Sequence, residues 1–155
     1  MKARLYPAWI SKLFIFVVAA LTFTGFMQMP LAKRYGIVEI PGMAWTGDFF
    51  IVHKLHYLLA AILLFVVGLV VANWLLDWRD KLVLTKLGTA RVVVVPGLIV
   101  SGGFRVYRNL PGVTMDPMTI VTIEWVHFGL VMVLGGFALA ALIKKSSAYA
   151  VKKIQ

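Results

Sequence analysis

Four long apolar segments, separated by short stretches that hold most of the charged residues, constrain this chain more than any other feature. The segments cover approximately residues 9–29, 49–76, 89–107 and 117–143. A transmembrane helix needs about 20 predominantly apolar residues. Hydrophobic residues make up 61% of the chain, whereas soluble domains typically contain about 45–50%. We therefore predict an all-α integral membrane protein, a four-helix transmembrane bundle that forms a single domain over residues 1–155.

Two of the four segments admit another interpretation. Only thirteen residues separate Arg91 from Arg105 in the third segment, so it spans the membrane only if both arginine side chains extend to the interface. A re-entrant segment is the alternative. The first segment follows three basic residues, as in a signal peptide, but no small-x-small cleavage site precedes Lys33, so we expect it to be retained.

The distribution of basic residues predicts the orientation of the spans. Eleven of the sixteen lie in the N-terminal stretch, in the connection between the second and third segments, and in the C-terminal stretch. Cytoplasmic loops are enriched in lysine and arginine, so we expect both termini in the cytoplasm and the loops 33–48 and 105–116 outside. We therefore expect the basic residues behind the net charge of +10 to interact with lipid headgroups rather than with nucleic acid. The absence of cysteine excludes disulfides and protein-bound iron–sulfur clusters within the chain.

Ionisable residues inside an apolar span are costly and are functional candidates by default. They are His53, Lys54 and His56 in the second segment and Glu124 and His127 in the fourth. His56 lies eight residues after Asp48 and His127 eleven after Asp116, which places them about 12 and 16 Å along their helices. Because both helices begin on the outer side in the four-span topology, the two imidazoles reach similar depth.

Two imidazoles on facing helices can ligate the iron of one haem b from opposite faces. His53 and His56 lie one turn apart on the same helix face, so they cannot serve as that pair. We therefore predict that His56 and His127 are the axial ligands. His53 is then a neighbouring contact or a hydrogen bond between packed helices, and Lys54 an interfacial anchor.

Further polar residues near the outer boundary are candidates for contacts to haem propionates or a quinone. They are His53, Lys54, Arg105, Tyr107 and Arg108. Glu124, one turn before His127, and His53 are candidates for a proton relay to a quinone. A hydrogen bond to a neighbouring helix or to a water beside the haem is the alternative for Glu124.

Three stretches of the chain resemble a known family. They are "PAWISKLFIFVVAALTFTGF" (7–26), "KLHYLLAAILLF" (54–65) and "EWVHFGLVMVLGG" (124–136). They are similar to the first, second and fourth helices of the four-helix cytochrome b membrane subunit of formate dehydrogenases and nickel–iron hydrogenases, whose first helix closes on "SG" or "TG". That family binds two haems through four histidines. Ala8 and Ala141 stand where the inner-haem ligands would be, so the resemblance implies a variant with one haem b, on His56 and His127.

The resemblance also implies a function. The chain would be a membrane-anchored electron-transfer subunit in the inner membrane of a prokaryote. It would pass electrons between extracytoplasmic iron–sulfur or multihaem cytochrome subunits and a menaquinone or ubiquinone pool, in contact with membrane lipid. Its quinone site is in doubt, because the family's site lies beside the inner haem.

Three other functions remain open at this point. One is a haemless membrane anchor that docks a redox complex and forms a quinone pocket. The second is a di-iron site built from the His53–His56 and Glu124–His127 pairs, although such sites use more carboxylates. The third is a small ion or proton transporter that uses the same polar residues. No internal repeat is evident.

Overall fold

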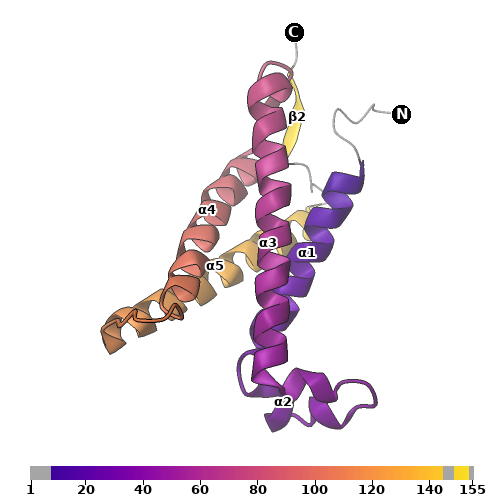
Figure 1. Cartoon of the computed structure of the whole chain (residues 1–155). Coiled ribbons are helices and arrows are strands. Elements are labelled where there is room, and N and C mark those ends of the chain that lie inside the picture. The colour runs from indigo at the N-terminus through magenta and orange to yellow at the C-terminus, as the bar shows by residue number, and fades with distance from the viewer. Residues whose placement is uncertain (1–7, 145–148, 154–155) are drawn as a thin grey trace. The chain divides into compact units, whose positions relative to one another are not determined.

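Two pairs of helices make up most of the computed structural model, which describes residues 8–144 and 149–153. The chain divides into two compact units, the first reaching Trp78 and the second beginning at Arg79. In the first unit, α1 (Ala8–Met27) packs beside α3 (Phe49–Asn73), and the two run in opposite directions (Figure 1). In the second unit, α4 (Lys86–Tyr107) packs in the same way beside α5 (Pro117–Ile143).

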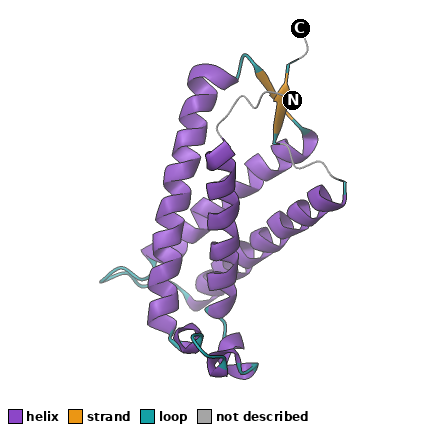
Figure 2. Cartoon of the chain, turned by 90° about the vertical axis from the view of Figure 1, so that its right-hand side faces the viewer, coloured by secondary structure: helices purple, strands orange, loops and turns teal. Residues whose placement is uncertain are grey.

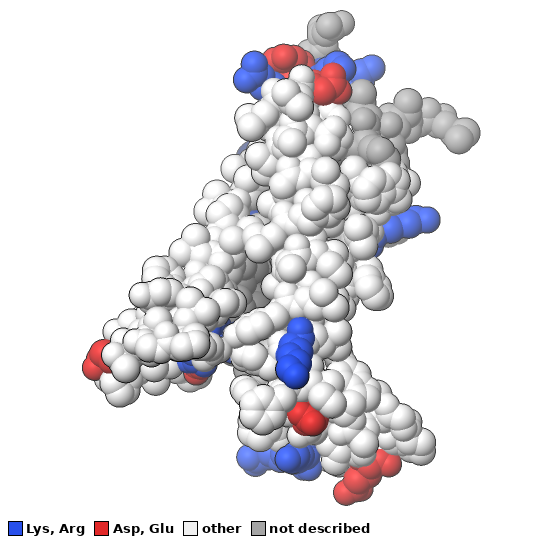
Figure 3. Space-filling model, viewed as in Figure 1, with Lys and Arg blue, Asp and Glu red and all other residues white. Residues whose placement is uncertain are grey.

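Within the described residues, these four helices are long and apolar enough to cross a membrane. The predicted all-α class with four transmembrane helices is therefore confirmed, and the chain is a multi-pass membrane protein. On the face shown in Figure 3, charged atoms gather near the ends of the helices and the helix sides between them are mostly uncharged. The third span is one continuous helix of 22 residues. It begins three residues before the predicted start, where the Thr85 hydroxyl accepts a hydrogen bond from the Gly88 N–H.

The contact between α1 and α3 repeats every seven residues. The buried residues are Ile10, Val17 and Thr24 on α1 and Val52, Leu59 and Val66 on α3. Seven residues make two helical turns, so each set forms one stripe, as in a left-handed helix pair. Helices in lipid gain little from burying apolar surface against each other and depend on close packing and interhelical hydrogen bonds. Thr24, the single hydroxyl residue among these six, is therefore a candidate for a hydrogen bond between the two helices.

The connection between α1 and α3 folds into three short helices at one end of the first unit (Figures 1 and 2). They are α2 (Leu31–Arg34), η1 (Ile37–Glu39) and η2 (Ala44–Gly47). Gly36, with a φ of 66°, makes the left-handed turn between the first two. The Asp48 carboxylate then caps α3 by accepting hydrogen bonds from Phe50 N at 2.9 Å and Ile51 N at 3.1 Å. At its other end, α3 continues as the π-helical turn η3 (Trp74–Trp78).

A short strand pair closes the second unit beside the start of α4. Strand β1 (Leu82–Leu84) pairs antiparallel with β2 (Ala150–Lys152), with Leu82 opposite Lys152. The sequence did not indicate these strands, because each has only three residues. The bases Lys2, Arg4 and Lys145, which contribute to the predicted topology, lie outside the described residues.

Arg91 differs from its prediction. The sequence placed it at the edge of the third span with its side chain extended to the interface. In the structure it lies inside α4 and is 5% exposed. Its Nη2 donates a hydrogen bond to the Phe137 carbonyl of α5 at 3.1 Å, and its guanidinium lies 4.8 Å from the centre of the Tyr149 ring. The buried cation is therefore satisfied by polar and aromatic groups of its own unit.

Candidate functional site

His56 lies on the face of α3 that packs against α1. It follows the buried Val52 by four residues and precedes the buried Leu59 by three. Its Nδ1 atom lies 2.8 Å from the hydroxyl oxygen of Thr24 on α1. Thr24 is 2% exposed, and the same hydroxyl lies 2.8 Å from the carbonyl oxygen of Ala20. The imidazole is thus tied to the neighbouring helix through one nitrogen.

His127 has the same arrangement in the second unit. Its Nδ1 atom lies 2.9 Å from the hydroxyl oxygen of Ser101 on α4. Ser101 is 6% exposed, and its hydroxyl lies 2.8 Å from the carbonyl oxygen of Gly97, four residues earlier. In each unit, therefore, a buried hydroxyl on the first helix contacts both its own backbone and the histidine of the second helix.

The positions of the carbonyl oxygens favour the imidazole as the donor in both contacts. A hydroxyl carries one proton, whereas a carbonyl oxygen can only accept. Thr24 Oγ1 and Ser101 Oγ lie 2.8 Å from such oxygens, so each hydroxyl donates its proton to its own helix. Each hydroxyl can then only accept from the imidazole, whose Nδ1–H is the donor. In this tautomer a neutral imidazole carries its basic lone pair on Nε2, the nitrogen that can bind a metal.

A glycine follows each of the two hydroxyl residues and lies close to the imidazole. A Cβ atom added at Gly25 would lie 3.5 Å from His56 Cε1, and one added at Gly102 would lie 3.4 Å from His127 Cε1. Both distances correspond to van der Waals contact, so a larger side chain at either position would press on the ring. The pairs Thr24–Gly25 and Ser101–Gly102 thus form the same local surface in the two units.

Sequence reasoning missed Thr24 and Ser101 as site residues. The signal that could have found them is a hydroxyl–glycine dipeptide inside a predicted span, which occurs as "TG" at 24–25 and "SG" at 101–102; a further "TG", at 46–47, lies in the connection between the first two spans. The sequence alone does not show that the hydroxyl of this dipeptide contacts a histidine, because that contact depends on how the helices pack.

The other predicted site residues divide between the two units. In the first, His53 Nε2 lies 2.8 Å from the hydroxyl of Tyr57, and its ring stacks on Phe49 with centroids 5.0 Å apart. Lys54, on the same helix, is exposed. His53 thus contacts aromatic residues of its own helix one turn before and one turn after it.

In the second unit, Arg108 pairs with Glu124. The Nη1 atom of Arg108 lies 2.7 Å from Oε1 of Glu124, with side chains 19% and 46% exposed. The pair connects the end of α4 to the first half of α5. Arg105, one turn beyond Ser101, is partly buried, and Tyr107 is 50% exposed. The alternative expected for Glu124, a polar contact to a neighbouring helix, is thus present as an ion pair.

Of the other residues that the resemblance singled out, Ala8 is exposed and Ala141 is 2% exposed. Among the residues that the structure describes, no three His, Cys, Asp or Glu side chains come close enough together to hold a metal ion. His56 and His127 belong to different units, and the geometry of each is that of its own helix pair.

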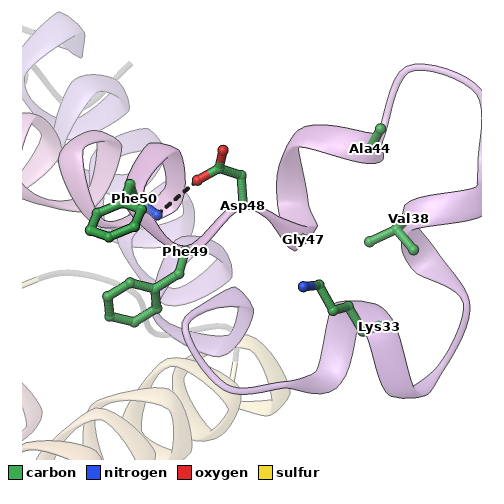
Figure 4. A pocket seen from close by; sticks show the side chains of 7 residues that line it. All are labelled: Lys33, Val38, Ala44, Gly47, Asp48, Phe49 and Phe50. Carbon is green, nitrogen blue, oxygen red and sulfur yellow. Dashed lines mark hydrogen bonds between the residues drawn. The ribbon is translucent and has the colours of Figure 1, made fainter.

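A shallow hollow lies beside the connection in the first unit (Figure 4). Its lining residues are Lys33, Val38, Ala44, Gly47, Asp48, Phe49 and Phe50. Asp48 already caps α3 through Phe50 N, as the dashed line in Figure 4 marks. A Cβ at Gly47 would lie 2.7 Å from Val38 Cγ1, so glycine allows the close packing of this connection. The hollow is lined mainly by apolar atoms that position the start of α3.

Comparison with protein-family models, with curated proteins and with solved structures gave no match. The fold and the site together define a class: an α-helical multi-pass membrane protein in which each of two helix pairs holds a histidine against a buried hydroxyl. The resemblance to the cytochrome b subunit stays a prediction.

Proposed function

We propose that this protein is the membrane-anchored electron-transfer subunit of a respiratory redox complex. In this proposal it binds one haem b, to which each helix pair supplies one axial ligand through Nε2 of His56 or His127. The observation that supports the proposal is the matched geometry of the two histidines. Each has its Nδ1 atom beside a buried hydroxyl, at 2.8 Å from Thr24 and 2.9 Å from Ser101.

The residues fit the chemistry of a bis-histidine haem. Ligating histidines commonly donate the second ring N–H to a neighbouring acceptor, which fixes the tautomer and the ring orientation. Both histidines here have such an acceptor, and a glycine beside each ring keeps bulky side chains away. When bound, a low-spin haem b supplies reversible one-electron transfer. Arg105, Tyr107 and Lys54 are the proposed partners for its propionates or for a quinone.

The proposed partners follow from the resemblance. Electrons would pass between an extracytoplasmic iron–sulfur or multihaem cytochrome subunit and menaquinone or ubiquinone. Quinone reduction takes up protons. For this step we propose His53, hydrogen-bonded to Tyr57, ahead of Glu124, whose carboxylate is engaged by Arg108.

Optical spectroscopy of the purified protein tests the proposal. We expect a reduced-minus-oxidised spectrum of low-spin haem b in the wild type. His56→Ala and His127→Ala should each abolish it, and His53→Ala, on the same helix as His56, should retain it. A colourless, iron-free preparation from haem-replete cells would falsify the proposal, and haem loss in His53→Ala alone would overturn the ligand assignment.

A haemless anchor is the second candidate, and one observation favours it. The Thr24–His56 and Ser101–His127 hydrogen bonds each join two helices, and interhelical hydrogen bonds stabilise membrane proteins without any cofactor. In that case His56→Ala and His127→Ala would lower the unfolding temperature of a colourless protein. The wild-type spectrum therefore distinguishes the two functions.

The proposed orientation, with both termini in the cytoplasm of a prokaryotic inner membrane, has a direct test. Because the chain has no cysteine, single cysteines report their own accessibility. Glu39 and Asp80 are exposed and lie on opposite sides in the proposed topology. Glu39→Cys should react with a membrane-impermeant maleimide in intact spheroplasts, and Asp80→Cys only after lysis. The reverse result would invert the orientation.

A further inference from the structure

We infer that Thr24 and Ser101 are positioning residues that fix the tautomer of His56 and His127 and tune the haem potential. This inference rests on the proposed haem and assigns a role to two residues that would act through the histidines. It begins from the contacts already described: both hydroxyls are at most 6% exposed, and both lie within 2.9 Å of an imidazole Nδ1.

The two hydroxyls are restricted to accepting from the histidines. Each donates its only proton to the carbonyl four residues earlier, from Thr24 to Ala20 and from Ser101 to Gly97. A second carbonyl, three residues earlier in each helix, lies 3.2 Å from the same hydroxyl oxygen. The proton is thus held on the helix side in both units, and only a lone pair of the hydroxyl faces the histidine.

Removing the hydroxyl has two chemical consequences. First, a buried Nδ1–H loses its acceptor, so the ring can rotate or move its proton to Nε2, the nitrogen that binds iron. Loss of such a supporting partner typically weakens metal binding by about 10–100-fold. Second, an Nδ1–H that donates a hydrogen bond makes the imidazole a more basic ligand. A more basic ligand favours ferric over ferrous iron, so removing the acceptor should raise the reduction potential.

The chain supplies matched variants for a test. Thr24→Val and Ser101→Ala remove the acceptors, and Thr24→Ser and Ser101→Thr restore them. Thr22→Val is the control in α1, because the Thr22 hydroxyl bonds only to its own helix, to Val18 O at 2.9 Å, among the contacts described. Thr89→Val is the control in α4, where the hydroxyl bonds to Thr85 O at 3.2 Å.

Three readouts are measured on the full-length protein in detergent: haem titration of the apo form, the midpoint potential, and ¹⁵N NMR shifts of labelled histidine in the apo form. We expect the acceptor-removing variants to bind haem about 10–100-fold more weakly and at a higher potential. The Ser and Thr exchanges and both controls should match the wild type. The ¹⁵N shifts should show the Nδ1–H tautomer at His56 and His127.

The outcomes separate this inference from the proposed function. Wild-type potential and affinity in Thr24→Val and Ser101→Ala would overturn the inference while the haem stands. If the wild type binds no haem, the proposed function fails, and the ¹⁵N shifts decide the tautomer by themselves. An Nε2–H tautomer at either histidine, or an unchanged shift in the variants, would overturn the inference. If Thr24→Val or Ser101→Ala fails to fold, the test relies on Thr24→Ser or Ser101→Thr at the same position, which must give the wild-type haem affinity and potential, and on the ¹⁵N shifts of the wild type.

Discussion

The Nδ1 atom of His127 lies 2.9 Å from the hydroxyl of Ser101, which belongs to the other helix of its pair. The same relationship joins His56 to Thr24 at 2.8 Å in the first unit. The two helix pairs are thus built alike at this point: in each, a hydroxyl followed by glycine on one helix faces a histidine on the other. This likeness is what makes the histidines a matched set of candidate ligands.

The first prediction concerns the glycine beside His56. Gly25→Ala places a Cβ atom 3.5 Å from His56 Cε1, an ordinary contact, and should change stability little. Gly25→Val adds two further carbons against the ring and should destabilise the protein by about 1–3 kcal/mol through overpacking. Unfolding in a detergent titration measures the change. Gly68→Val on α3, where an added Cβ meets no atom within 4 Å, is the control. An equal loss in both variants would contradict the proposed contact.

The Arg108–Glu124 ion pair should contribute to the stability of the second unit. Its atoms lie 2.7 Å apart, and the side chains are partly exposed, so a double-mutant cycle of Arg108→Gln and Glu124→Gln should give a coupling of about 0.2–1 kcal/mol. The exposed Arg79–Asp80 pair, at 4.0 Å, should give a smaller value. If Glu124 instead carries protons to a quinone, Glu124→Gln would lower quinone reduction while Arg108→Gln would not.

Arg91 should be needed for folding of the second unit rather than for binding lipid headgroups. Its guanidinium is buried and donates to the Phe137 carbonyl. Arg91→Leu removes a hydrogen bond from a charged donor and should lower the free energy of unfolding by about 1.5–3 kcal/mol. Arg79→Leu, at an exposed position, should change it much less. Equal effects of the two substitutions in a thermal unfolding experiment would show that Arg91 is not held as described.

Gly88 should tolerate no side chain, because a Cβ there would overlap the carbonyl oxygen of Tyr149. We expect Gly88→Ala to separate β2 from the start of α4 and to destabilise the protein. Gly103→Ala, in the same helix but with no atom within 4 Å of the added Cβ, should instead stabilise it by about 0.5–1 kcal/mol, because alanine is the better helix former. The opposite signs, read from unfolding temperatures, test the placement of Tyr149. Two changes of the same sign would refute it.

Hydropathy was sufficient to predict the membrane spans. A bilayer requires about 20 apolar residues per helix, and the observed helices begin and end within three residues of the predicted bounds, with the π-helical turn to Trp78 included in the second. The third span was less predictable, because the Arg91 side chain was expected to extend to the interface and is instead buried within the second unit. The sequence could not show that Arg91 is buried, because its partners, the Phe137 carbonyl and the Tyr149 ring, are brought to it by the fold.

The candidate histidines could be found from the sequence, but their supporting hydroxyls could not. Histidine inside an apolar span is rare enough to be conspicuous. A hydroxyl is not, because it can satisfy itself by bonding to its own helix, as Thr22, Thr89 and Thr122 all do. Thr24 and Ser101 make that same bond and differ only in facing a histidine of the paired helix.

The sequence by itself determined the class of the protein and the number of spans, and it showed how few ionisable groups the spans contain. Each of these can be read one segment at a time, because a charged side chain or an unpaired backbone group in lipid is costly whatever the neighbouring helices are. The tertiary structure decided which side chains meet. It paired His56 with Thr24, His127 with Ser101, and Arg108 with Glu124. Such contacts depend on which face each helix turns to its neighbour, and helix packing, rather than hydropathy, sets that rotation.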